Sequence, residues 1–300
     1  MTFTLVEFPS EGATLRGRLY LPDRLPAPVV VMAHGYTATV AMVLDRYAEA
    51  FQAAGIAALA YDHRGFGQSD GEPRGEINAW MQARGYRSAV DHVRGLSEID
   101  PRRIALWGDS ISAAEVMAVA ALDSDIAAVV VQVPAFGDDV AEDDPGDLRF
   151  AAMRRHLLGG TLRGPSAGWS SMTVVSPDQV ALPSALLPLT AFRWFIEYGA
   201  RYGADWVNRA TFTRNPEAPP WESLLWAAHV DTPTLLVMSP DDEMEGAASA
   251  VTRAAYERLR GPREIVEVEG GHFGILFHPS PLFDQASATE AAFLRRTFGA

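Results

Sequence analysis

The sequence predicts an α/β protein with a mostly parallel central sheet, helices on both faces of the sheet and an inserted helical cap. Three observations support this prediction. Short continuous apolar runs, as expected for strands covered on both faces, alternate with amphipathic segments at helical spacing. A hairpin pattern precedes the first run, and the alternation is interrupted once, between about residues 136 and 226.

The composition is that of a folded protein, with 48% hydrophobic and 21% charged residues in a chain of 300. No apolar run approaches the roughly 18 residues of a membrane-spanning helix, and the N-terminus lacks a signal-peptide pattern, so we expect a cytoplasmic protein without membrane contact. The absence of cysteine excludes disulfides and cysteine nucleophiles. The formal charge of −13 disfavours binding to nucleic acids and anionic lipids.

The predicted elements follow in order along the chain. Residues 2–8 and 13–21 alternate apolar and polar side chains, which predicts an antiparallel hairpin. Buried parallel strands are predicted at residues 29–32, 57–60, 104–107, 127–133 and 234–238, and a further strand at 264–268. Helices are predicted near residues 40–54, 76–98, 112–121, 247–259 and 282–298.

The interruption predicts two regions, a core of residues 1–136 and 227–300 and an inserted cap of residues 137–226. The cap shows short helical stretches and no strand run. It contains five of the seven tryptophans, which are Trp169, Trp194, Trp206, Trp221 and Trp226. These indoles either form the core of the cap or line a substrate pocket between the cap and the sheet.

A candidate nucleophile lies in the segment Gly-Asp-Ser-Ile-Ser at residues 108–112, between a buried strand and a helical run. A sharp turn from strand to helix would hold the Ser110 hydroxyl clear of the sheet. Gly108 provides the small residue that such a turn needs, whereas Ser112 stands where a second glycine is usual. Asp109 could influence substrate preference through its charge. Alternatively, Ser110 only caps the helix.

A serine nucleophile needs a histidine base and an acid that orients it. His272, in a glycine-flanked loop after the last predicted strand, is the candidate base, with His278 as the fallback. The other histidines, His63, His92, His156 and His229, are expected at the surface, in the cap or in loops. The strand at 234–238 ends in three carboxylates, of which Asp242 is the candidate acid and Asp241 the alternative.

Residues 34–36, His-Gly-Tyr, directly follow the strand at 29–32. Gly35 would allow a close approach of the backbone, so the amides of Tyr36 and Ile111 could bind an oxyanion. His34 is expected to pack below the site. Alternatively, Gly35 only makes a tight turn.

In this order, the motifs His-Gly-Tyr, Asp-His-Arg-Gly-Phe-Gly-Gln-Ser-Asp-Gly at 62–71, Gly-Asp-Ser-Ile-Ser, Asp-Asp and Gly-Gly-His-Phe resemble those of α/β-hydrolases. The resemblance spans about residues 28–278, and within the superfamily the chain is similar to dienelactone-hydrolase-like and X-prolyl-peptidase-like bacterial hydrolases. It implies a cofactor-free enzyme with Ser110, Asp242 and His272 as triad and the Tyr36 and Ile111 amides as oxyanion hole. Arg64 and Asp70 are expected to pin their loop.

These observations predict a serine hydrolase that cleaves a small-molecule ester or lactone, with an apolar group suggested by the cap tryptophans. Peptidase, amidase or carbon–carbon bond hydrolysis on the same triad is the alternative, and the acidic run at 138–147 could bind a peptide amine. A ligand receptor without catalysis is a third possibility. We expect no metal and a monomer or homodimer.

Overall fold

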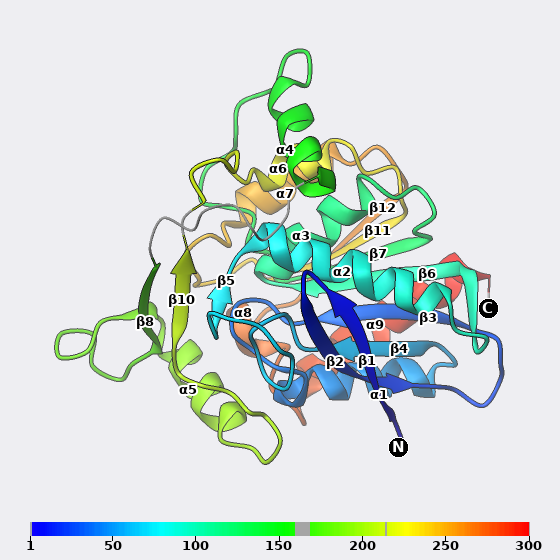
Figure 1. The fold of residues 1–300 in the computed structure, drawn as a ribbon, viewed down its shortest axis with the longest axis horizontal. Helices are drawn as coiled ribbons and strands as arrows, with labels where there is room; N and C mark the ends of the chain where they lie inside the picture. The colour runs from blue at the N-terminus through cyan, green and yellow to red at the C-terminus, as the bar shows by residue number, and fades with distance from the viewer. Residues whose placement is uncertain (1, 160–168, 214, 300) are drawn as a thin grey trace.

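The computed structural model describes residues 2–159, 169–213 and 215–299 and has the predicted α/β fold class (Figure 1). Within the described residues, the main sheet has eight strands in the order β1-β2-β4-β3-β6-β7-β11-β12. The first pairs, β1 with β2 and β2 with β4, are antiparallel, and all later neighbours are parallel. The strand bounds are β1 Thr4–Ser10, β2 Ala13–Tyr20, β3 Ala27–Ala33, β4 Ala57–Tyr61, β6 Ile99–Asp109, β7 Ala128–Gln132, β11 Thr234–Met238 and β12 Arg263–Glu267.

The central strands are apolar over most of their length because both of their faces are buried, whereas the first residues of β6 are mostly polar and partly exposed. In β3, Val29 and Val31 join the hydrophobic core on one side of the sheet, while Val30 and Met32 join the core on the other side. All four side chains are 0% exposed. The period-2 alternation of a strand thus supplies two cores from one continuous apolar run.

Helices cover both faces of the sheet, as predicted. Residues of α2, α3, α6 and α7 contribute to the first core, and residues of α1, α5, α8 and α9 contribute to the second. Figure 1 shows α2 and α3 on the upper side of the sheet and α1 on the lower side. The helix bounds are α1 Asp45–Ala53, α2 Ala79–Arg94, α3 Ile111–Ala120, α4 Leu148–Gly159, α5 Leu189–Gly199, α6 Ser223–Ala227, α7 Ser249–Arg258, α8 Gly271–Gly274 and α9 Pro281–Phe298. A distorted helical turn, Val40–Leu44, precedes α1.

The inserted segment contains strands as well as helices, so the prediction of no strand between residues 136 and 226 is wrong. Strands β8 (Trp169–Val175), β9 (Ser184–Leu186) and β10 (Ala210–Thr213) form a small sheet with β5 (Glu76–Ile77), in the order β5-β10-β8-β9. β9 and β10 have only three and four residues, and β8 is only partly buried, with Ser170 exposed and Val174 buried, so these strands lack the apolar run of a core strand. The predicted boundary at 226/227 falls inside α6.

The cap tryptophans have two different surroundings. Trp221 and Trp226 pack with Trp80 of α2, with ring centroids 4.7 and 6.3 Å from that of Trp80. Trp194 and Trp206 lie near the loop after β3 instead, where Trp206 Nε1 donates to Thr37 Oγ1 over 3.1 Å. The side chain of Trp169 lies outside the described residues. Among the described helices, none is long and apolar enough to cross a membrane.

Candidate active site

The turn that carries Ser110 joins the end of β6 directly to the start of α3. Ser110 has a φ of 52°, a left-handed conformation that a non-glycine residue adopts mainly where the surrounding structure imposes it. A Cβ atom at Gly108 would lie 2.4 Å from the Ser112 carbonyl oxygen, so only glycine fits there. The strand, strained serine and helix have the backbone geometry that the sequence predicts for a nucleophile elbow.

The loop after β3 approaches this elbow closely. A Cβ atom at Gly35 would lie 2.6 Å from the Asp109 carbonyl oxygen and 2.8 Å from Ser110 Cβ, so only glycine permits this approach. The next residue, Tyr36, has a φ of 52°. Within the described part of the chain, neither the Tyr36 amide nor the Ile111 amide donates a hydrogen bond. Both amides are thus available to a ligand beside Ser110.

The candidate base and acid lie in contact. His272, in the short helix α8, has its Nδ1 atom 2.8 Å from Asp242 Oδ2, and each side chain is 4% exposed. Asp241 does not touch the imidazole, because it accepts hydrogen bonds from the Gly270 and Gly271 amides at 3.2 Å. The Ser239 hydroxyl and these amides lower the pKa of Asp241. Of the two candidate acids, the structure brings Asp242 to the base.

The third carboxylate of this turn also supports the base. Glu243 Oε2 accepts a hydrogen bond from the His272 amide over 2.8 Å. The three consecutive carboxylates therefore have different contacts. Asp241 contacts the loop before His272, Asp242 contacts the imidazole of His272, and Glu243 contacts the His272 backbone. His278, the fallback base, has a different contact: its amide donates to the Tyr198 hydroxyl over 2.7 Å.

Ser110 and His272 line the same cavity, which encloses about 560 Å³ including its open mouth. Tyr36 and Ile111 line it as well, so the cavity brings together four of the five predicted site residues. No hydrogen bond joins Ser110 to His272 in the part of the chain that the structure describes; such contacts often tighten only when substrate binds. Asp242 does not line the cavity itself but contacts His272, which does.

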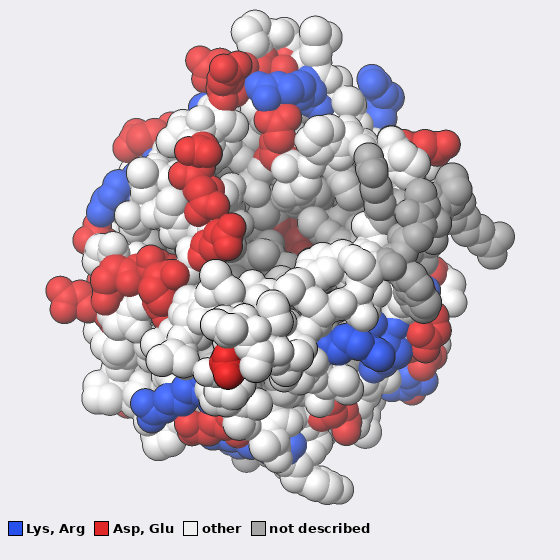
Figure 2. Space-filling view, turned by 90° about the vertical axis from the view of Figure 1, so that its left-hand side faces the viewer, with Lys and Arg blue, Asp and Glu red and all other residues white. Residues whose placement is uncertain are grey.

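Apolar side chains form most of the remaining wall. They come from the inserted segment, from α8 and from the residues just after α8, and they are Leu186, Trp194, Phe195, Phe273 and Leu276. Trp194 is fixed by a hydrogen bond from its Nε1 atom to the Leu276 carbonyl, 2.8 Å long. Residues of the inserted segment and residues from the rest of the chain therefore line the cavity together. Figure 2 shows this end of the molecule face-on, with a hollow near its centre, acidic side chains to the left and a mostly uncharged surface just below the hollow.

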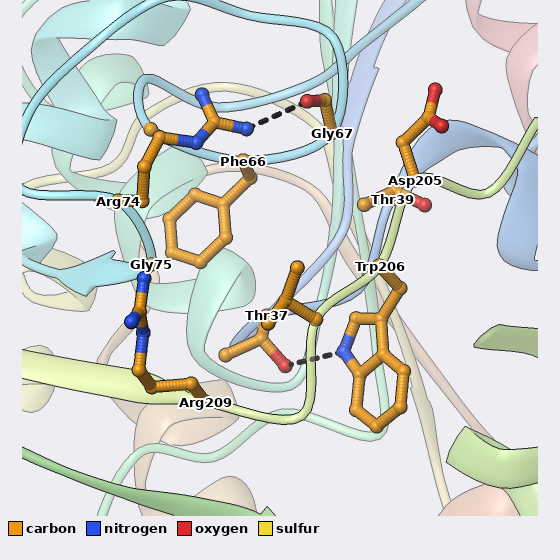
Figure 3. A pocket seen from close by; sticks show the side chains of 11 residues that line it. Thr37, Thr39, Phe66, Gly67, Arg74, Gly75, Asp205, Trp206 and Arg209 are labelled. Carbon is orange, nitrogen blue, oxygen red and sulfur yellow. Dashed lines mark hydrogen bonds between the residues drawn. The ribbon is translucent and has the colours of Figure 1, made fainter.

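A second cavity of about 420 Å³, including open solvent, lies across the loop of residues 35–39 (Figure 3). Gly35, Tyr36 and Ala38 line the first cavity, whereas Thr37 and Thr39 line the second. The other walls of the second cavity come from the loop of residues 65–75 and from residues 205–209. The loop with the Tyr36 amide thus separates the two cavities.

The loop of residues 62–71 is held by its own polar side chains, as predicted. Asp70 pairs with Arg16 at 2.6 Å, and Arg64 donates to the Glu72 carbonyl over 3.0 Å. The Asp62 carboxylate accepts from the Val40 amide over 2.8 Å. No group of three or more His, Asp or Glu residues in the described ranges could hold a metal ion.

A buried polar network lies beneath the elbow, and most of it was not predicted. Ser112 Oγ lies 2.9 Å from the His34 carbonyl, 3.0 Å from Glu115 Oε2 and 3.3 Å from His63 Nε2. The Ser112 hydroxyl has one proton to donate, and both the His34 carbonyl oxygen and Glu115 Oε2 lie within reach as acceptors. Burial raises the pKa of Glu115 well above its usual value, in line with a protonated acid, and lowers the pKa of His63 to about 3. In the sequence, this network could have been recognised from Glu115, a single acidic residue within the otherwise apolar run 113–120.

Comparisons with known proteins agree with this architecture. A family model described as serine aminopeptidase, S33, matches residues 25–166. Polyketide transferase grgF from a Penicillium species is 38% identical over 274 residues, which cover 91% of this chain and 90% of that protein. The crystal structure of the α/β hydrolase GrgF superposes with a TM-score of 0.77 and 25% identity, covering 100% of both chains. The chain belongs to the α/β-hydrolase superfamily.

Other relatives of this α/β hydrolase match over a shorter stretch. Quorum-quenching protein AidA of Acinetobacter baumannii is 39% identical over 61% of this chain and 64% of its own length. Thiohydrolase apmlB of Arthrinium phaeospermum is 43% identical over 43% of this chain and 42% of its own length. The matches thus span less than two thirds of these two proteins. The prediction of a hydrolase is confirmed at the level of the family.

Proposed function

We propose that this α/β hydrolase cleaves a carboxylic ester or lactone with an apolar acyl group, through an acyl-enzyme on Ser110. The observation that carries the proposal is the contact between His272 and Asp242. The imidazole donates from Nδ1 to a nearly buried carboxylate over 2.8 Å, and its residue lines the same cavity as Ser110. An imidazole held in this tautomer presents Nε2 as a base.

In the proposed reaction, His272 Nε2 takes the Ser110 hydroxyl proton as Ser110 Oγ bonds to the carbonyl carbon. The oxyanion that forms accepts hydrogen bonds from the Tyr36 and Ile111 amides. The bond to the leaving oxygen then breaks, and His272 returns its proton to that oxygen. Water, deprotonated by His272, attacks the acyl-enzyme and releases the acid and free Ser110.

The walls of the cavity support an apolar acyl group. Aromatic and aliphatic side chains of the cap and core face a space of about 560 Å³, in the size range of small-molecule sites. Glu245 and Asp109 also line it. With a formal charge of −13 on the whole chain, these carboxylates favour a neutral substrate over an anionic one.

A fluorophosphonate probe read by intact mass tests the proposal. The wild type should gain one adduct, Ser110→Ala should gain none, and Ser112→Ala should remain labelled because Ser112 is 0% exposed and donates to a carbonyl. Turnover should then be measured on p-nitrophenyl esters of increasing acyl length. An unlabelled wild type that is folded by circular dichroism would contradict the proposal and favour a ligand receptor.

Thioester cleavage or acyl transfer is a second candidate function. It is supported by the names of the relatives, which include a thiohydrolase and a polyketide transferase, the latter matched over 91% of this chain. The same acyl-enzyme would form from a thioester and pass its acyl group to water or to another nucleophile. Oxygen esters and thioesters with the same octanoyl group, compared by kcat/KM with and without added alcohols, distinguish these functions.

The peptidase alternative is less well supported by the acidic run at 138–147. Asp138 accepts from the Gly246 amide over 2.7 Å, and Asp144 accepts from the Phe150 amide over 2.9 Å. Asp138 thus contacts a distant loop and Asp144 a local turn, so both carboxylates have partners within the protein. A panel of aminopeptidase substrates tests the alternative, and a panel of β-diketones tests carbon–carbon bond hydrolysis.

A further inference from the structure

His34 is buried directly beneath the candidate oxyanion loop, and both of its ring nitrogens face acceptors. Nε2 lies 2.7 Å from the Met42 carbonyl oxygen, and Nδ1 lies 2.9 Å from Asp109 Oδ2. The side chains of His34 and Asp109 are 1% and 4% exposed. A carbonyl only accepts hydrogen bonds, so Nε2 carries a proton. A neutral imidazole would then have no proton on Nδ1 to donate to the carboxylate.

Asp109 also holds the next residue of the loop. Its Oδ1 atom accepts from the Gly35 amide over 2.6 Å, so one carboxylate contacts both His34 and Gly35. Ser112 adds a further link by donating to the His34 carbonyl. Asp109 directly precedes Ser110, and Ser112 follows it by two residues. Together they join the elbow to the loop that carries the Tyr36 amide.

We propose that His34 is an imidazolium paired with Asp109, and that this buried ion pair positions the oxyanion loop against the nucleophile elbow. The positioning part rests on the proposed function, since it concerns the oxyanion hole. His34 and Asp109 are positioning residues, because they act through the backbone of Gly35 and Tyr36. Asp109 therefore has a task beyond the influence on substrate preference suggested by its place in the sequence.

The surroundings of His34 are compatible with a positive ring. Burial lowers the pKa of His34, but Asp109, the Met42 carbonyl and Asp45 act in the opposite direction and leave that pKa raised. Asp62 also interacts electrostatically with His34, and His63 is the nearby group that could oppose its charge. Trp107 and Trp194 pack edge-on against the ring, with centroids 6.3 and 5.8 Å away.

The charge of His34 can be measured without any assay of activity. The ¹⁵N shifts of its ring in the wild type, assigned with a His34→Gln variant, should show two protonated nitrogens at pH 7 to 8, where a free histidine with a pKa of about 6.5 is mostly neutral. A ring with only one protonated nitrogen at pH 7 would be a neutral imidazole, and this result would overturn the ion pair.

The positioning role is tested with Asp109→Ala, Asp109→Asn and the matched control Asp23→Asn, which changes an exposed carboxylate. The alanine removes both contacts, so kcat should fall by about tenfold to a hundredfold with KM within about twofold, because the misplaced amides act mainly in the transition state. The asparagine can still accept from the Gly35 amide and should recover part of kcat. Its His34 ring should be neutral at pH 7.

The outcomes separate this inference from the proposed function. If both Asp109 variants turn over like the wild type, or if KM rises while kcat is unchanged, the positioning role is wrong. If Asp109→Ala does not fold, Asp109→Asn and the wild-type spectrum still decide. If Ser110 is not labelled by a fluorophosphonate while His34 is doubly protonated, the proposed function fails and the ion pair stands.

Discussion

Asp242→Asn is the most specific test of the candidate triad, because Asp241→Asn provides a matched control one residue away. Asn keeps the size of Asp242, but its amide can present a donor to His272 Nδ1. The ring would then carry its proton on Nε2, the nitrogen that must accept the Ser110 proton. Asp241 contacts the backbone of the same loop instead of the imidazole.

The size of the effect follows from the contact that is lost. The Nδ1 to Oδ2 distance is 2.8 Å, and both side chains are 4% exposed, so water cannot replace the carboxylate. Substitution of Asn for Asp at such a position lowers kcat by about 10⁴-fold. At 1.36 kcal/mol per factor of ten, this is a loss of about 5 kcal/mol of transition-state stabilisation. Asp241→Asn should change kcat by less than about tenfold, because its amide oxygen can still accept from Gly270 or Gly271.

The assay is the rate of fluorophosphonate labelling and the kcat for the best p-nitrophenyl ester, measured for both variants at several pH values. Thermal unfolding of each variant checks that the fold is retained. Equal losses in the two variants would show that the turn needs both carboxylates for its conformation. Activity of Asp242→Asn within tenfold of the wild type would remove Asp242 from the triad.

Three further predictions concern the core and the cavity. Burial raises the pKa of Glu290 from 4.5 to about 8. Between these two values the folded protein holds a proton that the unfolded chain releases. The free energy of unfolding should therefore fall as the pH rises from about 5 to 8. Glu290→Gln should flatten this slope in urea unfolding, and parallel wild-type and variant curves would contradict it. Gly35→Ala should destabilise the protein by about 1–3 kcal/mol and lower kcat, because the new Cβ would lie 2.6 Å from the Asp109 carbonyl oxygen; an unchanged melting temperature would show that the loop can move. Leu186→Ala should shift the preference of p-nitrophenyl ester hydrolysis toward longer acyl chains and Leu186→Phe toward shorter ones, since Leu186 lines the cavity; identical chain-length profiles would place the acyl group elsewhere.

The central strands could be predicted from the sequence because burial on two faces leaves a local signal. Strands β3, β4, β7 and β11 are mostly apolar runs, and each was predicted within a few residues of its observed bounds. In β6 only the run at 104–107 was predicted, because the strand begins at Ile99 with a mostly polar, partly exposed stretch. The small sheet of the cap left no such signal. Its strand β10 has only four residues, and its partners β5 and β8 lie far away in the sequence. Pairing across such distances depends on tertiary structure.

The candidate site could be predicted where a motif has its own local geometry. Gly108 and Ser110 are such a case, because the turn from strand to helix needs a small residue and a strained serine within three positions. The partner of His63 could not be predicted in this way. Ser112 and Glu115 reach it from another element, and only the folded structure shows that three polar side chains share one buried space.

The polar groups buried around the elbow explain how two strained residues can persist side by side. Ser110 and Tyr36 each have a φ of 52°, which costs of order 1–3 kcal/mol per residue unless neighbouring contacts fix the backbone. The Tyr86 hydroxyl supplies one such contact, since it lies 3.0 Å from the Ala33 carbonyl and 2.9 Å from the Trp107 carbonyl, just before the loop and the elbow. Glu115 approaches from α3 and Glu290 from α9, and burial keeps the pKa of both carboxyls high. Because the Asp109 carboxylate contacts both the His34 ring and the Gly35 amide, its loss should loosen the loop and the elbow before it unfolds the sheet.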